Sequence, residues 1–194
     1  IHENNDENII AIDLDYPQHS LNERRIADIS LLQNDSDDEA SLNNLTKDPF
    51  PIQTFKIEEI GESLSEMKKS ENYLIFVDLA GTLNQKSYLS LIKELDFAVI
   101  PLSASYLDFQ ATIPILEIIN KNSPKTKIII VWNKIKTSES PTIMNAFEKY
   151  FTDVFPKTYL MRYKIKDLVY WKNNLSTIFP TSKIKEFAIE FYKQ

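Results

Sequence analysis

Two kinds of hydrophobic pattern alternate along this chain. Continuous apolar runs rich in β-branched residues predict buried strands over residues 9–15, 73–78, 96–101 and 127–132. Weaker patterns predict an edge strand flanked by prolines and a short late strand, over residues 51–55 and 158–160. Apolar residues three or four apart predict helices over residues 21–33, 57–69, 85–95, 105–120, 141–151, 165–174 and 182–192. Because strands alternate with helices, we expect an α/β fold. Its core is a doubly wound, mostly parallel sheet with helices on both faces, in a single domain over residues 1–194.

Some of these elements carry more specific expectations. Ser20 and Glu23 have the spacing of a capping box at the start of the first helix. Helical periodicity predicts that this helix buries Ile26, Ile29 and Leu32. Pro114 should kink or interrupt its helix. The strand ending at Asp78 lacks clean alternation, so we expect it to be a central strand that is buried on both faces.

Composition and charge narrow the class of protein. The chain has 194 residues and two histidines. It contains no cysteine, which excludes disulfides and thiolate metal sites. No apolar run reaches the roughly 18 residues of a membrane span, so we expect a cytoplasmic protein without a membrane partner. The net charge of -6 is uneven, because residues 1–48 are strongly acidic and residues 156–194 are basic.

Polar residues stand at the ends of three predicted strands. Asp13 and Asp15 stand at the C-terminal end of the first strand, Asp78 ends another, and Asn133 follows the strand 127–132. In a parallel sheet such strand ends meet at one edge, where ligands bind. Two carboxylates there suit Mg²⁺, which in turn implies a phosphate substrate, and an asparagine amide could read a nucleobase edge. The alternatives are structural: a turn at each aspartate and a strand-end cap at Asn133.

A cradle for phosphate groups is missing. Such a loop needs several glycines, a lysine and a Ser or Thr, so that backbone N–H groups can face the phosphates. The chain contains only two glycines, Gly61 and Gly81, and they fall in different elements. Gly81 permits a tight turn or close approach to a ligand after the strand that ends at Asp78.

Four segments together resemble the ParA/MinD family of deviant Walker A ATPases. They are IIAIDLDYPQHSL, NYLIFVDLAGT, the strand beginning DFAVIP, and the strand ending in VWNK. With the late NNLSTIFP, these motifs are most similar to the ParA-like TraA proteins of Bacteroides-type conjugative transposons. The resemblance implies a P-loop-type fold that lacks here its first strand and its K-G-G-x-G-K-S/T loop. We therefore expect the sequence to be an N-terminally truncated piece, and the function to belong to the intact protein.

The resemblance also implies roles for particular residues. Asp15 would be the catalytic switch carboxylate that orients the attacking water or the magnesium shell, with Asp13 supporting it. Asp78 would hold Mg²⁺ through water, Gly81 would approach the γ-phosphate, and Asn133 would contact adenine. The implied function is an ATP-dependent dimerisation switch in plasmid or conjugative-transposon partition, maintenance or transfer. Its cofactors are ATP and Mg²⁺, and its partners are ATP or ADP, a second copy and a partition or transfer protein. The chain as given is expected to be inactive as an ATP hydrolase.

Two other interpretations stay open. One is a non-enzymatic ParA-like interaction module without a phosphate loop. The other is a receiver-like or phosphatase-like domain that uses Asp13, Asp15 and Asp78 for phosphoryl chemistry.

Nonspecific DNA binding is a separate expectation, carried by the basic C-terminal part of the chain. Its alternative is a solvated basic surface. The candidate residues are Arg162, Lys164, Lys166 and Lys172.

Overall fold

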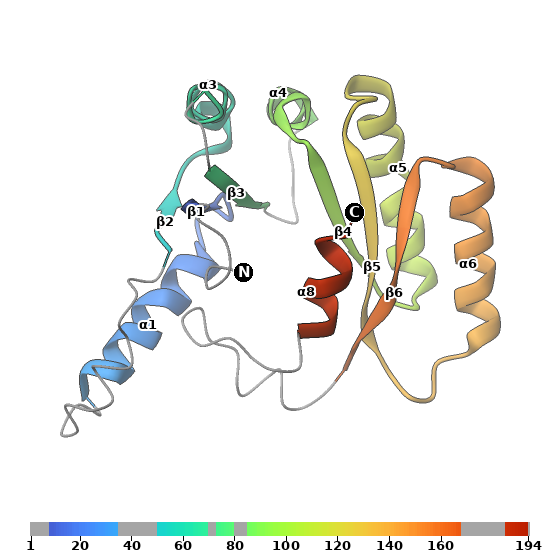
Figure 1. Ribbon diagram of the computed structural model, residues 1–194. Coiled ribbons are helices and arrows are strands. Elements are labelled where there is room, and N and C mark those ends of the chain that lie inside the picture. The colour runs from blue at the N-terminus through green and yellow to red at the C-terminus, as the bar shows by residue number, and fades with distance from the viewer. Residues whose placement is uncertain (1–7, 35–49, 70–72, 80–84, 168–184, 194) are drawn as a thin grey trace. The chain divides into compact units, whose positions relative to one another are not determined.

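The computed structural model describes residues 8–34, 50–69, 73–79, 85–167 and 185–193 (Figure 1). The chain divides into two compact units, Ile1–Leu91 with Ser176–Pro180 and Ile92–Leu175 with Thr181–Gln194. Among the described residues, each unit holds one three-stranded, entirely parallel sheet flanked by helices. The predicted α/β class is therefore confirmed, while the single domain stays a prediction. None of the described helices is long and apolar enough to cross a membrane.

The sheet of the first unit has the strand order β2-β1-β3. The central strand β1 contributes the buried side chains Ile9, Ala11 and Ile12, as its β-branched run predicts. In α3, Ile60 and Leu64 are buried one helical turn apart. The elements assigned before the second unit's sheet are β1 (Asn8–Asp13), α1 (Ser20–Asn34), β2 (Ile52–Thr54), α3 (Ile57–Met67), β3 (Tyr73–Asp78) and α4 (Gln85–Glu94).

The prediction that the strand ending at Asp78 is central and buried on both faces is wrong for the described sheet. β3 pairs with β1 alone, in register from Tyr73 to Asp78, and so forms an edge. Tyr73 and Phe76 are 45% and 40% exposed, and no residue of β3 is fully buried. The central position belongs to β1.

The prediction for the buried face of α1 is also wrong for Ile26 and Ile29, while the side chain of Leu32 lies outside what the structure describes. Ile26 and Ile29 are exposed, whereas Arg25 and Asp28 are buried. The Arg25 guanidinium lies 4.7 Å from the centre of the Phe50 ring and donates a hydrogen bond to the Phe50 carbonyl at 2.8 Å. Burial lowers the pKa of Arg25, and the neighbouring Asp28 charge opposes that shift. Specific polar and aromatic contacts therefore outweigh simple periodicity on this helix.

In the second unit the strand order is β4-β5-β6, with helices on both faces (Figure 1). Trp132 of the central strand packs against Phe147 of α6 on one face. On the other face, Ile129 and Val131 pack against Phe187 and Phe191 of α8. The buried strand predicted from the continuous apolar run 127–132 is thus confirmed for β5, which packs against helices on both faces. The remaining elements are β4 (Phe97–Leu102), α5 (Tyr106–Asn122), β5 (Lys127–Ile135), α6 (Pro141–Val154), β6 (Thr158–Lys166) and α8 (Lys185–Phe191).

One sequence prediction fails in this unit, and another fails in part. α5 continues past Pro114, so the proline does not interrupt the helix, while the kink expected as the other outcome stays a prediction. β6 runs to Lys166 and includes Ile165, which was expected to begin a helix. The strand extends because its last residues still have partners on β5, where Ile135 pairs with Lys166. Tertiary pairing here outweighs the weak helical pattern.

Candidate functional site

The candidate site lies where β1 and β3 end side by side. Asp13 and Asp78 are register partners across this pair of parallel strands. The Leu14 N–H continues the ladder by donating to the Asp78 carbonyl at 2.9 Å. The carboxyl ends of the two strands therefore place two aspartates next to each other, as their positions in the sequence predicted.

Asp13 is fully buried and holds the beginning of α1. One carboxylate oxygen accepts hydrogen bonds from the backbone N–H groups of Leu21 and Asn22, both at 3.0 Å. The other accepts the N–H of Asp15, also at 3.0 Å. A helix leaves its first N–H groups unpaired, and here a strand-end carboxylate pairs two of them. These hydrogen bonds give Asp13 a structural role, which the sequence had left open beside support of Asp15.

The capping box predicted from Ser20 and Glu23 is wrong. The Glu23 N–H, which the Ser20 side chain would accept in a capping box, donates instead to the His19 carbonyl at 2.9 Å. The Ser20 hydroxyl turns instead to the Asp15 carboxylate, to which it donates at 3.2 Å. Asp15 is partly exposed, so its carboxylate is oriented by Ser20 and still open to solvent.

A tight turn joins β1 to α1. Its last residue, His19, has a φ of 45°, in the left-handed region that non-glycine residues adopt only sparsely. The peptide bond between Tyr16 and Pro17 is cis. The His19 Nδ1 is buried 3.7 Å from an Asp13 oxygen, beyond hydrogen-bond distance, and has no hydrogen-bond partner among the described residues. The Tyr16 ring stands edge-on to the imidazole.

The charges at the site act on one another. Partial burial raises the pKa of Asp78, and the charges of Asp13 and Asp15 raise it further. Three carboxyl groups therefore share one edge of the first sheet and repel one another. Within the described ranges, no group of three or more His, Cys, Asp or Glu side chains is arranged to hold a metal ion by itself.

The other predicted site residues are not brought to this edge by anything the structure describes. Gly81 lies outside the described residues. Asn133 belongs to β5 of the second unit, where its side-chain oxygen accepts the N–H of Lys134 at 3.0 Å. Because β5 continues to Ile135, Asn133 lies inside the strand, and the prediction that it follows the strand is wrong. Its contact with adenine stays a prediction.

Comparison with known proteins does not place the chain. No family model matches it, and no curated protein matches it either. What the fold and the site define is therefore a class: an α/β protein with parallel sheets and an acidic strand edge.

Proposed function

We propose that this chain carries the magnesium-side half of the nucleotide pocket of a ParA-like ATPase. The observation that carries the proposal is the pairing of β1 with β3, which sets Asp13 and Asp78 side by side at the carboxyl edge of a parallel sheet. Ligands of open α/β sheets bind at such edges. In the complete protein, ATP would favour a dimer and hydrolysis would release it, in partition, maintenance or transfer of a plasmid or conjugative transposon in the cytoplasm.

The residues present fit a magnesium ion. Mg²⁺ prefers oxygen ligands, keeps several waters and is held through one or two carboxylates. Asp15 and Asp78 offer two, and a cation between them would relieve the repulsion that raises the pKa of Asp78. When bound, the ion would neutralise charge on phosphate oxygens.

The residues present do not fit the phosphate groups of ATP. The sequence holds two glycines and no glycine-rich loop, so nothing in these residues would cradle a triphosphate. Asp15, oriented by Ser20, is the group assigned to the attacking water, and Asp13 is a positioning residue that fixes the start of α1.

Cation binding should depend on the carboxylates of Asp78 and Asp15. Asp78→Asn and Asp15→Asn should each weaken binding of Mn²⁺, used as a paramagnetic probe for Mg²⁺, by at least about tenfold. Electron paramagnetic resonance of free Mn²⁺ measures the affinity. Asp153→Asn, at an exposed position on α6, makes the same chemical change and should have no effect. Equal Mn²⁺ binding by all three variants would exclude this site.

Asp78→Asn should also make the protein more stable at neutral pH. The pKa of Asp78 is raised on folding from its ordinary value of 3.8, so the folded state disfavours the charged form. The free-energy cost of ionising Asp78 in the folded state is absent at pH values below 3.8 and complete above the raised pKa. A variant that loses Mn²⁺ and also unfolds more readily would point to a folding defect rather than a binding site.

The proposed ATP-dependent dimerisation switch is tested with the product of the complete gene. If the residues encoded before Ile1 contain K-G-G-x-G-K-S/T and the protein shows no magnesium-dependent ATP binding, the ATPase proposal fails. A start codon directly before Ile1 would favour the second candidate, a non-enzymatic interaction module. The observation that favours that candidate is the shortage of glycine.

Nonspecific DNA binding by β6 is a further part of the proposal. Arg162, Lys164 and Lys166 are exposed at alternate positions of β6, between partly buried Tyr163 and Ile165. Alternation places the three cations on one side of the strand, where they could follow a phosphate backbone. Lys172 lies outside the described residues.

The second prediction tests this basic side of β6. Changing Arg162, Lys164 and Lys166 together to Ala should weaken binding to duplex DNA. The slope of the salt dependence should fall by about 0.9 for each DNA phosphate that the variant no longer neutralises. Fluorescence anisotropy over a salt series measures both. The matched control changes three exposed lysines of the same unit, Lys121, Lys125 and Lys149. Equal losses in the two triple variants would show that net charge alone is responsible.

A further inference from the structure

One carboxylate joins α8 to the sheet of the second unit. Glu190 accepts the backbone N–H groups of Arg162 and Tyr163 at 2.6 and 2.8 Å, and the hydroxyl of Tyr159 at 2.8 Å. Burial raises the pKa of Glu190, but the two N–H donors, the hydroxyl and the Arg162 charge lower it by more. The net pKa therefore lies below its ordinary value, as expected for a carboxylate that accepts several hydrogen bonds.

An irregularity in β6 explains why these two N–H groups turn to a side chain. Ile130 pairs with Leu160 and Trp132 with Lys164, so four steps along β6 match two steps along β5. Extra residues in one strand disrupt the ladder locally. Arg162 and Tyr163 lie inside this bulge, and consecutive N–H groups in irregular backbone form a concavity that suits an anion. Glu190 fills it from α8.

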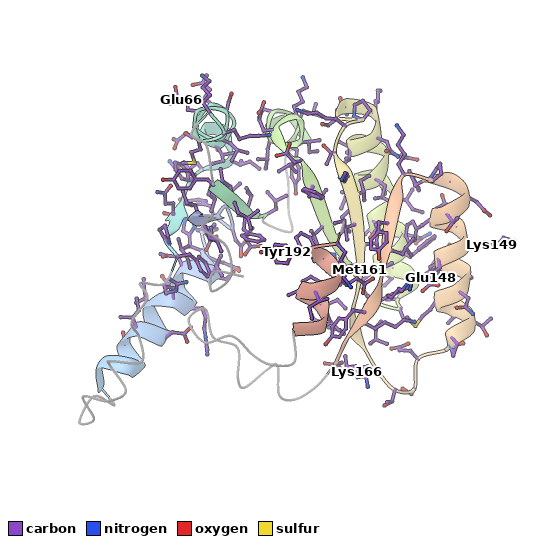
Figure 2. All side chains as sticks on the ribbon, viewed as in Figure 1. Glu66, Glu148, Lys149, Met161, Lys166 and Tyr192 are labelled. Atoms are coloured by element: carbon purple, nitrogen blue, oxygen red, sulfur yellow. The ribbon has the colours of Figure 1, made fainter. Side chains whose placement is uncertain are left out.

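α8 also covers a small apolar surface. Ile129, Val131 and Met161 are 1 to 2% exposed and pack against the rings of Phe187 and Phe191 (Figure 2, which labels Met161). Both rings are themselves only partly buried. A seven-residue helix is too short to be stable alone, so α8 exists because it is attached here.

The opposite face of the same sheet has its own core. Phe109 of α5 stacks on Phe147 of α6 with ring centres 4.1 Å apart, and it also packs against Phe151. The Trp132 indole N–H donates to Glu148 of α6 at 2.9 Å on this face. None of these interactions involves α8. The sheet can therefore keep its α5–α6 layer when α8 leaves.

We propose that α8 is a detachable strap, held by the Glu190 carboxylate in the β6 bulge, which opens while the sheet stays folded. Opening uncovers the surface formed by Ile129, Val131 and Met161. Local opening of this kind is typical of short elements that pack on an otherwise complete layer. The proposal does not depend on nucleotide or DNA binding.

Hydrogen exchange of the whole chain, resolved by residue, tests the strap. Glu190→Ala should speed exchange of the Arg162 and Tyr163 amides and of α8 roughly tenfold or more, as expected for losing hydrogen bonds to a charged group. Glu190→Gln keeps the shape and one acceptor oxygen, and it should give a smaller effect at the same amides. The central amides of β5 should not change. Ile189→Ala, at an exposed neighbouring position on α8, is the control.

Binding of anilinonaphthalene sulfonate gives a second measurement. The dye should bind more strongly to Glu190→Ala than to the unchanged protein, because the apolar surface under α8 is open more often. Faster exchange throughout β5 in step with α8, or failure of both Glu190 variants to fold, would show that α8 is an integral part of the core. Unchanged exchange at Arg162 and Tyr163 would show that Glu190 does not hold it. Either result overturns the proposal.

Discussion

Replacing Asp13 with Ala should destabilise the first unit by about 2–4 kcal/mol. Asp13 is fully buried, and its removal leaves the N–H groups of Leu21, Asn22 and Asp15 without their partner. Each unpaired buried donor costs about 1–3 kcal/mol, and entry of water into the vacated space offsets part of the sum. Urea unfolding, followed by exchange of the β1 amides, measures the loss.

Two further variants separate the hydrogen bonds of Asp13 from its charge. Asp13→Asn keeps one acceptor oxygen and should fall between the Ala variant and the unchanged protein. Asp15→Ala removes a partly exposed carboxylate with one hydroxyl partner and should cost less than about 1 kcal/mol. If Asp13→Ala were no more harmful than Asp15→Ala, the capping role would be wrong.

The same Asp13 variants should change the titration of Asp78. The Asp13 charge is one of the causes that raise the pKa of Asp78, so removing it should move that pKa back toward its ordinary value. Carboxyl chemical shifts followed by NMR across the acid range report the change. Such a change would show that the charge of Asp13 acts electrostatically on Asp78, in the proposed cation site.

Replacing Phe151 with Ala should destabilise the second unit by about 3–5 kcal/mol, the range for truncating a buried aromatic residue. Phe151 is fully buried on α6, with its ring centre 5.3 Å from that of Phe109 and 6.0 Å from that of Tyr150. The loss combines the transfer of the ring from the core to water with the cavity that remains. Urea unfolding followed by far-UV circular dichroism measures it.

The control for Phe151 is an aromatic residue on the same layer that is not buried. Tyr106 of α5 is 63% exposed, and Tyr106→Ala should change stability by no more than about 0.5 kcal/mol. A cost of about 1 kcal/mol or less for Phe151→Ala would mean that the α5–α6 layer rearranges to fill the space. In that case this layer could not serve as the permanent core that the α8 strap requires.

The strands of this protein could be read from its sequence because their pattern reflects local chemistry. The β-branched runs of β1 and β5 suit extended, buried backbone, and both strands form there, although β1 already ends at Asp13 and β5 continues to Ile135. The start of α6 at Pro141 was also predictable, since a proline at the first helical position loses no hydrogen bond. The position of Asp13 and Asp78 at strand ends followed from the same patterns.

The structure decided which strand is central, which face of α1 is buried and what caps that helix. Asp13 reaches N–H groups eight and nine residues further along the chain, an interaction that depends on the turn after β1 and leaves no local signal. Arg25 is buried because the Phe50 ring and carbonyl lie beside it. Glu190 finds its partners 27 to 31 residues away in a strand bulge.

The sequence by itself therefore determined the class of fold and the acidic strand ends, because strand and helix patterns arise from neighbouring residues. Only the tertiary structure showed that one of those acids, Asp13, is used to hold α1, while Asp15 and Asp78 stay open to solvent. The physical reason is that a carboxylate's role depends on which donors and charges surround it. These neighbours come from segments that only folding brings together.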